Sequence, residues 1–171
     1  MAETAQKISE SQESLAQLAG KYLTFQLGDE SYGLEILKVQ EIIGMQTITR
    51  IPRTPEYVKG VINLRGKVIP VIDLRLRFNM ETAEVSRKTC IIVVQVSKEE
   101  TSVTMGIVVD EVSEVLEIAA EEIEPAPGFG TQVETSFILG MAKAENAVKI
   151  LLDIDKIMSE GEMAALARSV G

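Results

Sequence analysis

Acid–base catalysis in this chain would have to rely on carboxylates, because the 171 residues include no histidine and only one cysteine. The lack of histidine excludes Ser-His-Asp and Cys-His sites and imidazole metal ligands. Two acidic pairs remain, Asp110 with Glu111 and Asp153 with Asp155. A hydrolase would need one acid of such a pair held protonated in a pocket. Each pair falls at a predicted strand end or helix cap, so the sequence favours binding over catalysis.

Cofactor motifs are also missing from the sequence. No GxxxxGK[ST], GxGxxG or HExxH pattern occurs, and Cys90 lies inside an apolar run where a small buried hydrophobic residue is expected. We therefore expect no metal, nucleotide or organic cofactor and no enzymatic activity. Every apolar run is interrupted by a polar residue, and residues 1–20 do not resemble a signal peptide, so a cytoplasmic protein is expected.

The residue best suited to recognise a partner is Arg65, in the sequence KGVINLRGKVIPVIDLRLRF. Two β-branched runs flank a short polar turn, which predicts strand, turn, strand. We expect Gly60, Asn63 and Gly66 to supply the positive or unusual φ angles of this unit. Arg65 would then present its five N–H donors outward to a partner's carboxylate or carbonyl groups. A solvated turn arginine is the alternative.

Positive charge is concentrated in the middle of an acidic chain. The net charge is −9, but residues 50–88 contain nine Lys and Arg against four Asp and Glu, a net of +5 that leaves −14 for the remainder. An acidic protein partner fits this stretch better than RNA, because only Tyr57 and Phe78 are available as aromatic stacking platforms. Solvated charges that discourage strand-edge aggregation are a further alternative.

A self-comparison of the sequence indicates an internal duplication. Gly33–Ile43 aligns without gaps on Gly106–Leu116, and Gly60–Leu74 aligns on Gly140–Ile154, at offsets of 73 and 80 residues. Short strands at close intervals with turns between them are typical of small barrels, and each repeat has room for about five strands. The prediction is an all-β protein with two five-stranded barrels, and whether strands cross between them stays open.

The domain boundaries expected from this pattern are approximate. They are a flexible tail over residues 1–20, a first repeat over about 21–78, a polar linker over 79–88, a second repeat over about 89–154, and a C-terminal helix and tail over 155–171. Asp153 or Asp155 is expected to cap the C-terminal helix, which would pack on a barrel.

Five segments in order support a family resemblance: Tyr22–Leu27, YGLEILKVQEI (Tyr32–Ile42), IPRTPEYVKGVINLRG (Ile51–Gly66), VIPVIDLR (Val68–Arg75) and GIVVDEVSEVL (Gly106–Leu116). Over roughly residues 21–158 the chain closely resembles the CheW family of chemotaxis coupling proteins. The resemblance implies two five-stranded SH3-like barrels. It also implies an adaptor that links the cytoplasmic tips of transmembrane chemoreceptors to the regulatory domain of the histidine kinase CheA.

The resemblance further implies where receptors would bind. The matching positions are Arg65, Val39, Gly60, Gly106 and Val115, with Glu41 as a further candidate. The valines are equally compatible with a core and the glycines with turns or bulges. Self-association or mixed CheA-CheW rings, and recruitment to membrane receptor arrays without insertion, are also implied. A CheV-like or CheA-derived module is a related alternative, but the chain has no room for a receiver or ATPase domain.

Overall fold

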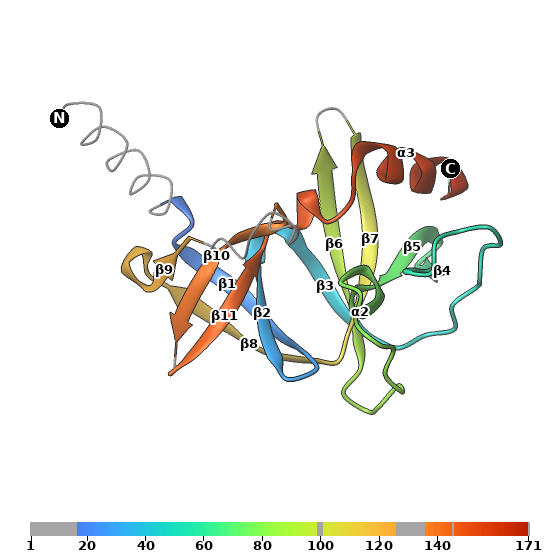
Figure 1. Cartoon of the computed structure of the whole chain (residues 1–171). Coiled ribbons are helices and arrows are strands. Elements are labelled where there is room, and N and C mark those ends of the chain that lie inside the picture. The colour runs from blue at the N-terminus through green and yellow to red at the C-terminus, as the bar shows by residue number, and fades with distance from the viewer. Residues whose placement is uncertain (1–16, 99–100, 126–135, 145, 171) are drawn as a thin grey trace.

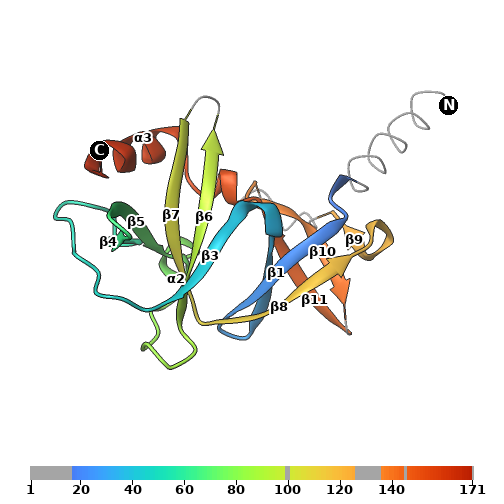
Figure 2. The same cartoon turned by 180° about the vertical axis from the view of Figure 1, so that it is seen from behind.

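The computed structural model describes residues 17–98, 101–125, 136–144 and 146–170, so most of the tail predicted over residues 1–20 lies outside the described residues. Most of the described chain is β-structure, folded into two curled sheets that lie beside each other (Figures 1 and 2). The predicted all-β fold with two SH3-like barrels is confirmed.

The first sheet has six strands in the order β8, β1, β2, β11, β10, β9. They are β1 (Gly20–Leu27), β2 (Glu30–Glu35), β8 (Glu111–Ile118), β9 (Ile123–Glu124), β10 (Ile138–Ala144) and β11 (Ala147–Leu152). The second sheet has five strands in the order β3, β6, β7, β5, β4. They are β3 (Val39–Gly44), β4 (Val58–Leu64), β5 (Lys67–Asp73), β6 (Cys90–Lys98) and β7 (Thr101–Val109). The first sheet therefore has one strand more than predicted, the two-residue β9.

Each sheet combines strands from both halves of the sequence. β1 and β2 of the first half pair with β8 and β11 of the second, and β6 and β7 of the second half pair with β3 and β5 of the first. The aligned segments Gly33–Ile43 and Gly106–Leu116 occupy equivalent places, because each runs from one sheet into the other. The chain crosses through the 3-10 turn η1 (Ile36–Lys38) and again between β7 and β8. Residues 79–88 consequently connect two repeats but do not separate two barrels.

Equivalent caps follow β5 and β11. The Asp73 side chain accepts hydrogen bonds from backbone N–H groups at the start of α2 (Leu74–Arg77), and the Asp153 side chain does the same at η3 (Ile154–Lys156). Asp73 and Asp153 are aligned at the offset of 80. A third 3-10 turn, η2 (Ala120–Glu122), joins β8 to β9.

The C-terminal helix α3 (Glu160–Val170) packs on β5 and β7 of the second sheet (Figure 1). Its cap is Ser159, whose Oγ accepts from the backbone N–H of Glu162 at 3.1 Å while Glu162 Oε1 accepts from Ser159 N–H at 2.9 Å. The expected cap at Asp153 or Asp155 is wrong for this helix, because Asp153 begins the short 3-10 turn instead. A capping box needs its acceptors three residues apart at the helix start, which Ser159 and Glu162 provide.

Three apolar clusters hold the molecule together. Tyr22 belongs to a cluster confined to the first sheet, and Val93 belongs to one confined to the second. Their chain neighbours Leu23 and Val94 point the other way, as alternate residues of a strand must, and join a larger cluster between the sheets. This central core also contains residues of α3, including the buried Leu166. Most of the buried apolar residues therefore belong to the core that the two barrels share.

Ion pairs tie the barrels together at one crossover. Arg75, directly after β5, donates from Nε to Asp110 Oδ1 at 2.8 Å and from Nη2 to Oδ2 at 2.5 Å. Asp110 lies between β7 and β8 and also accepts from the backbone N–H of Gly28 at 2.7 Å, in the β1–β2 turn. We call this group the Arg75–Asp110 clamp. It connects elements of both sheets.

A second clamp occupies the equivalent place at the other crossover. Lys38 Nζ donates to Asp155 Oδ2 at 2.7 Å, and Asp155 Oδ1 accepts from the backbone N–H of Ser97 at 2.8 Å. Asp155 is the residue aligned with Arg75 at the offset of 80. Lys38 is aligned with Glu111, the residue after Asp110, at the offset of 73. Each clamp thus joins one crossover to the segment that follows β5 or β11, with the cation and the carboxylate in exchanged places.

The Asp110→Asn variant tests the first clamp. We expect it to lower the free energy of unfolding at neutral pH by about 1–3 kcal/mol, because the mostly buried guanidinium of Arg75 loses its ionic partner. Urea unfolding measures the change. In the exposed pair Lys143–Glu124, the matched Glu124→Gln change should alter stability by less than about 0.5 kcal/mol. Equal effects of the two substitutions would show that the Arg75–Asp110 clamp stabilises the protein no more than an exposed ion pair does.

The clamp also predicts a pH dependence. Hydrogen bonds from Arg75 hold the pKa of Asp110 below its usual value. The stabilisation is therefore fully present above the unfolded-state pKa of about 3.9 and is lost as the pH falls through the lower folded-state pKa. The stability advantage of the native protein over Asp110→Asn should shrink below about pH 4. If this difference in the free energy of unfolding stayed constant across the pH range, the effect of Asp110→Asn would come from packing and not from the lost charge.

Candidate functional site

Arg65 lies at the tip of the β4–β5 hairpin, in which Leu64 is paired with Lys67. The turn consists of Arg65 and Gly66, whose φ angles are 51° and 89°. Two-residue hairpin turns of the I′ type require positive φ at both positions. The backbone N–H of Gly66 donates to Asn63 Oδ1 at 2.8 Å. The positive φ angle expected at Asn63 is therefore found at Arg65, and Asn63 contributes its side chain as an acceptor.

Arg65 forms a two-pronged ion pair with Glu41 on β3. Nη1 donates to Oε1 at 3.0 Å, and Nη2 donates to Oε2. Because β3 and β4 are the opposite edges of the second sheet, the curl of the sheet is what brings them together. These hydrogen bonds lower the pKa of Glu41. The Arg65 side chain is 71% exposed, and three of its five N–H donors have no acceptor in this pair, so it can bind a partner without leaving Glu41.

Val39 and Val115 lie on edge strands of different sheets. Val39 on β3 is paired with Val94 and is half-buried against the central core. Val115 on β8 is paired with Leu23, and its side chain is 49% exposed. Both pairing partners belong to the central core. The two valines therefore flank the shared core from opposite sheets, and Val115 is the more accessible of the two.

Gly60 and Gly106 are buried, so neither offers side-chain-free surface to a partner. Gly60 has a φ of 144°, and a Cβ atom there would lie 2.1 Å from the carbonyl oxygen of Thr49. A Cβ atom at Gly106 would lie 2.6 Å from Cγ2 of Ile91. Any influence of these glycines on binding would be indirect, through the packing of the strands that hold Arg65 and Glu41.

Three further apolar residues are exposed on the strands, and no motif in the sequence marked them as binding residues. Ile42 on β3 is 45% exposed, and it is the residue aligned with Val115 at the offset of 73. Val68 and Val148, aligned at the offset of 80, are 48% and 53% exposed. Each sheet thus exposes apolar side chains at the same two repeat positions. The duplication contained this signal, because residues with equivalent places have similar exposure.

The acidic pairs considered for catalysis have structural roles. Asp110 is hydrogen-bonded by Arg75, and its pKa is lowered, whereas a general acid needs a raised pKa. Asp153 caps η3, and Asp155 is paired with Lys38. These carboxylates at the ends of strands are thus engaged in capping and ion pairs.

The described residues contain neither a metal-binding cluster nor a membrane-spanning helix. Within residues 17–98, 101–125, 136–144 and 146–170, no three His, Cys, Asp or Glu side chains form a group that could hold a metal ion. None of the described helices is long and apolar enough to span a membrane. Cys90 is half-buried, and burial raises the pKa of its thiol.

Comparison with known proteins gives one consistent result. The CheW-like domain family matches residues 21–162. A chemotaxis protein CheW from Klebsiella aerogenes is 42% identical over 156 residues, which cover 88% of this chain and 92% of the relative. A chemotaxis protein CheW from Bacillus subtilis is 34% identical, with coverage of 82% and 87%.

The crystal structure of a CheW scaffolding protein from Thermoanaerobacter tengcongensis is also similar. It superimposes with a TM-score of 0.73 at 38% sequence identity, over 84% of this chain and 95% of the other. The protein FrzA of Myxococcus xanthus is a more distant relative, 28% identical over 151 residues. Sequence and fold therefore agree on the same family.

The burial of Gly60 leads to a stability prediction. Gly60→Ala should lower the free energy of unfolding by more than about 2 kcal/mol, because the new Cβ atom meets the Thr49 carbonyl and the φ of 144° is strained for alanine. Gly44→Ala on β3 is the control, since a Cβ atom there meets nothing within 4 Å. Chemical denaturation of both variants measures the difference. A Gly60→Ala variant as stable as Gly44→Ala would refute the structural role.

Proposed function

The chain belongs to the CheW family, whose domain spans nearly all of it, and from that premise we propose that it is a non-enzymatic adaptor of a chemotaxis pathway. In this proposal it couples the cytoplasmic hairpins of chemoreceptors to the histidine kinase CheA and supports kinase activation. The family match over residues 21–162 supports this proposal most directly. The relatives named as chemotaxis proteins agree with it.

The proposed receptor surface centres on the second sheet. Arg65, held by Glu41, would bind polar or acidic groups of the receptor, while Val39 and Val115 would contact apolar side chains of its helices. Gly60 and Gly106 would act through the packing of β4 and β7. The support for this arrangement is the exposure of Arg65 and its unused donors. Recognition would then combine a small apolar contact with a charged rim, as stable protein interfaces commonly do.

The kinase would bind elsewhere. We propose that the CheA regulatory domain contacts a separate barrel face. Self-association or mixed rings would use other exposed apolar positions of the two sheets, among them Val68 and Val148. The domain boundaries expected from the sequence, with one CheW-like domain over about residues 21–158, stay part of the proposal. The proposal also includes the absence of cofactors and of nucleic-acid binding. It further includes a cytoplasmic location with recruitment to membrane receptor arrays.

Reconstitution tests the proposed activity. Adding the purified protein to receptor-containing membranes and CheA should stimulate autophosphorylation of the kinase. Omitting the receptors should remove the stimulation, because an adaptor transmits a signal and does not produce one. Stimulation that persisted without receptors, or none in their presence, would contradict the adaptor function.

Arg65→Glu tests the receptor surface. Receptor binding in a pull-down should fall sharply, since the reversed charge repels acidic groups of the partner, while binding of the CheA regulatory domain should persist. The melting temperature should change little, because the side chain is largely exposed. Lys67→Glu reverses a neighbouring exposed charge on the same hairpin and is the matched control.

The ion pair allows a second, sharper variant. Arg65→Glu combined with Glu41→Arg restores an ion pair between β3 and the hairpin but places the cation on the other strand. If Arg65 contacts the receptor directly, this double variant should remain defective. Recovery of receptor binding would show that the pair only positions the hairpin.

A further inference from the structure

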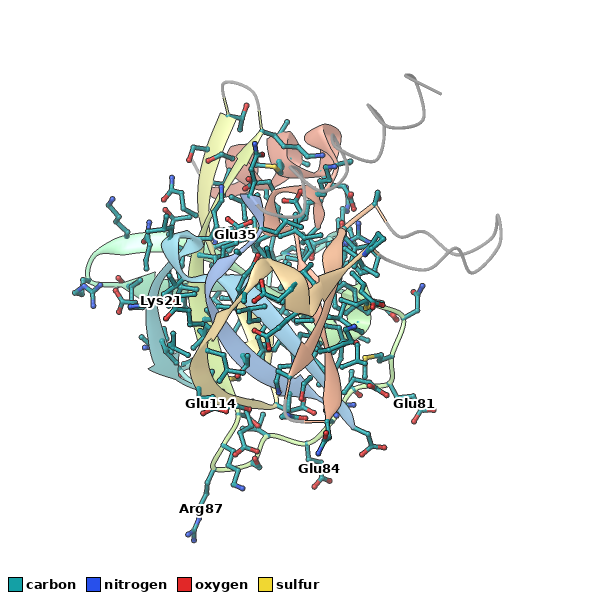
Figure 3. All side chains as sticks on the ribbon, turned by 90° about the vertical axis from the view of Figure 1, so that its left-hand side faces the viewer. Lys21, Glu35, Glu81, Glu84, Arg87 and Glu114 are labelled. Carbon is teal, nitrogen blue, oxygen red and sulfur yellow. The ribbon has the colours of Figure 1, made fainter. Side chains whose placement is uncertain are left out.

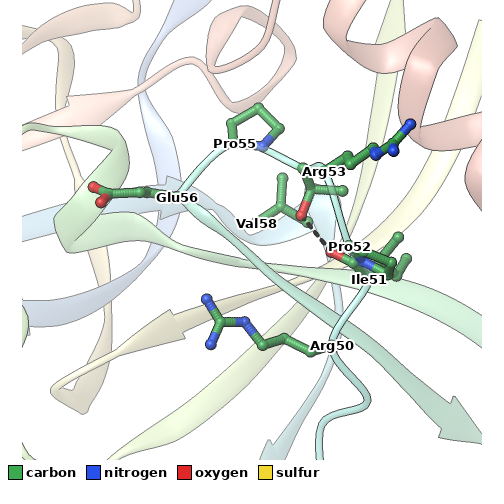
Figure 4. Close-up of a pocket in the computed structure, with 8 residues that line it drawn as sticks. Arg50, Ile51, Pro52, Arg53, Pro55, Glu56 and Val58 are labelled. Carbon is green, nitrogen blue, oxygen red and sulfur yellow. Dashed lines mark hydrogen bonds between the residues drawn. The ribbon is translucent and has the colours of Figure 1, made fainter.

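The loop between β3 and β4 encloses a hollow that none of the proposed contacts uses. Residues Arg50, Ile51, Pro52, Arg53, Thr54, Pro55, Glu56 and Val58 line it, and its volume is about 500 Å³ (Figure 4). Its floor includes the buried Val58, and its rim is formed by exposed charged and proline residues. A second hollow of about 390 Å³ shares Arg50, Glu56 and Val58 with the first and adds Lys59. The two hollows together form one basic depression.

The loop is fixed at both of its ends. Thr49 exchanges two backbone hydrogen bonds with Val61 on β4, at 2.9 and 2.8 Å. At the other end, the backbone N–H of Val58 donates to the carbonyl oxygen of Pro55 at 3.0 Å. Within the loop, Thr54 Oγ1 donates to the carbonyl oxygen of Ile51 at 2.9 Å (Figure 4). A binding surface that is already ordered loses little conformational entropy when a ligand arrives.

Arg53 adopts a backbone conformation that arginine rarely takes. Its φ angle is 63°, in the left-handed region that glycine and asparagine occupy more easily. Pro52 precedes it and lies in the same exposed turn. This unusual backbone conformation makes Arg53 a candidate for a functional residue.

Arg50 and Arg53 are two exposed arginines of this loop. In the part of the chain that the structure describes, neither side chain makes a salt bridge or a hydrogen bond, in contrast to Arg65, Arg75 and Arg77. The two side chains project from opposite sides of the loop (Figure 4). Two separated guanidinium groups cannot both bind one compact anion, but they can bind carboxylates spaced along an extended chain.

The chemistry of the loop also selects the type of anion. Pro52 and Pro55 have no N–H groups to donate to phosphate oxygens, and Glu56 at the rim repels a group of high negative charge. The apolar floor of the depression can contact the side chains that lie between the carboxylates of an extended chain. No aromatic residue lines either hollow, so stacking of nucleobases has no platform.

We propose that the depression formed by residues 50–59 is a second binding site, which takes an extended acidic peptide segment of a protein partner. Arg50 and Arg53 bind two carboxylates of the peptide, one on each side of the loop, and Ile51 and Val58 contact its backbone and small side chains. The site is separate from the Arg65–Glu41 pair and does not rest on the receptor contacts proposed above.

The test measures fluorescence anisotropy of a labelled decapeptide that alternates glutamate and alanine, titrated with the full chain. A peptide with glutamine in place of glutamate is the uncharged probe. We expect the glutamate peptide to bind at low salt and the glutamine peptide to bind much more weakly. Arg50→Gln combined with Arg53→Gln should weaken binding of the glutamate peptide by about tenfold or more.

Two variants separate this site from folding and from net charge. Arg53→Gly removes the guanidinium but suits the positive φ, so it should weaken binding without lowering the melting temperature. Arg87→Gln changes the charge equally at a residue that projects away from both barrels in the 79–89 connection, and it should leave binding unchanged (Figure 3).

Three outcomes would overturn the proposal. The first is an equal loss of binding in Arg87→Gln and in Arg53→Gly, which each remove one positive charge, because equal losses would indicate general charge attraction. The second is equal binding of the two peptides. The third is tighter binding of inorganic phosphate or of a single-stranded oligonucleotide through the same arginines, which would replace the acidic peptide with another class of ligand.

Discussion

The central core between the two sheets is the constraint on which the rest of the structure depends. Leu23 and Val94 come from different repeats but fill the same core, and each has its neighbouring residue in a separate core of its own sheet. Because β1 and β2 complete a sheet made mostly by the second repeat, neither barrel is built from one contiguous half of the chain. Arg65 and Glu41 then meet only when the second sheet is curled against this core, so the candidate site is a product of the whole fold.

Much of the fold was predictable because it repeats. The offsets of 73 and 80 residues aligned the strands correctly, since equivalent strands need similar apolar and turn residues. Strand exchange was not predictable, because residues such as Val39 and Val112 alternate in the same way whichever sheet accepts them. The chain passes from one sheet to the other at η1 and at Asp110, where the alternation of strand residues is interrupted. The cap of α3 was assigned to Asp153 or Asp155 because both precede an apolar stretch, although Ser159 and Glu162 have the spacing of a capping box.

The candidate site was predictable only in its local part. The NLRG sequence indicated a hairpin with an exposed arginine, and the structure contains one. The partner of Arg65 could not be inferred, because Glu41 is distant in the sequence and its approach depends on the curl of a five-stranded sheet. The family motif also included Gly60 and Gly106, which the structure buries. Close packing of backbones, such as that of Thr49 on Gly60, leaves no periodic pattern in the sequence.

The two clamps favour the pairing of one repeat with the other, because their cations and carboxylates come from different repeats. The first repeat contributes Lys38 and Arg75, and the second contributes Asp110 and Asp155. Arg75 is aligned with Asp155, and Lys38 is aligned with Glu111 beside Asp110. Two copies of the first repeat would therefore bring cations close together near both crossovers, and two copies of the second would bring carboxylates close together. A duplicated gene product starts with identical halves that pair equally well in every combination. Charge divergence at these four positions makes the mixed pairing of unlike repeats within one chain the favoured one.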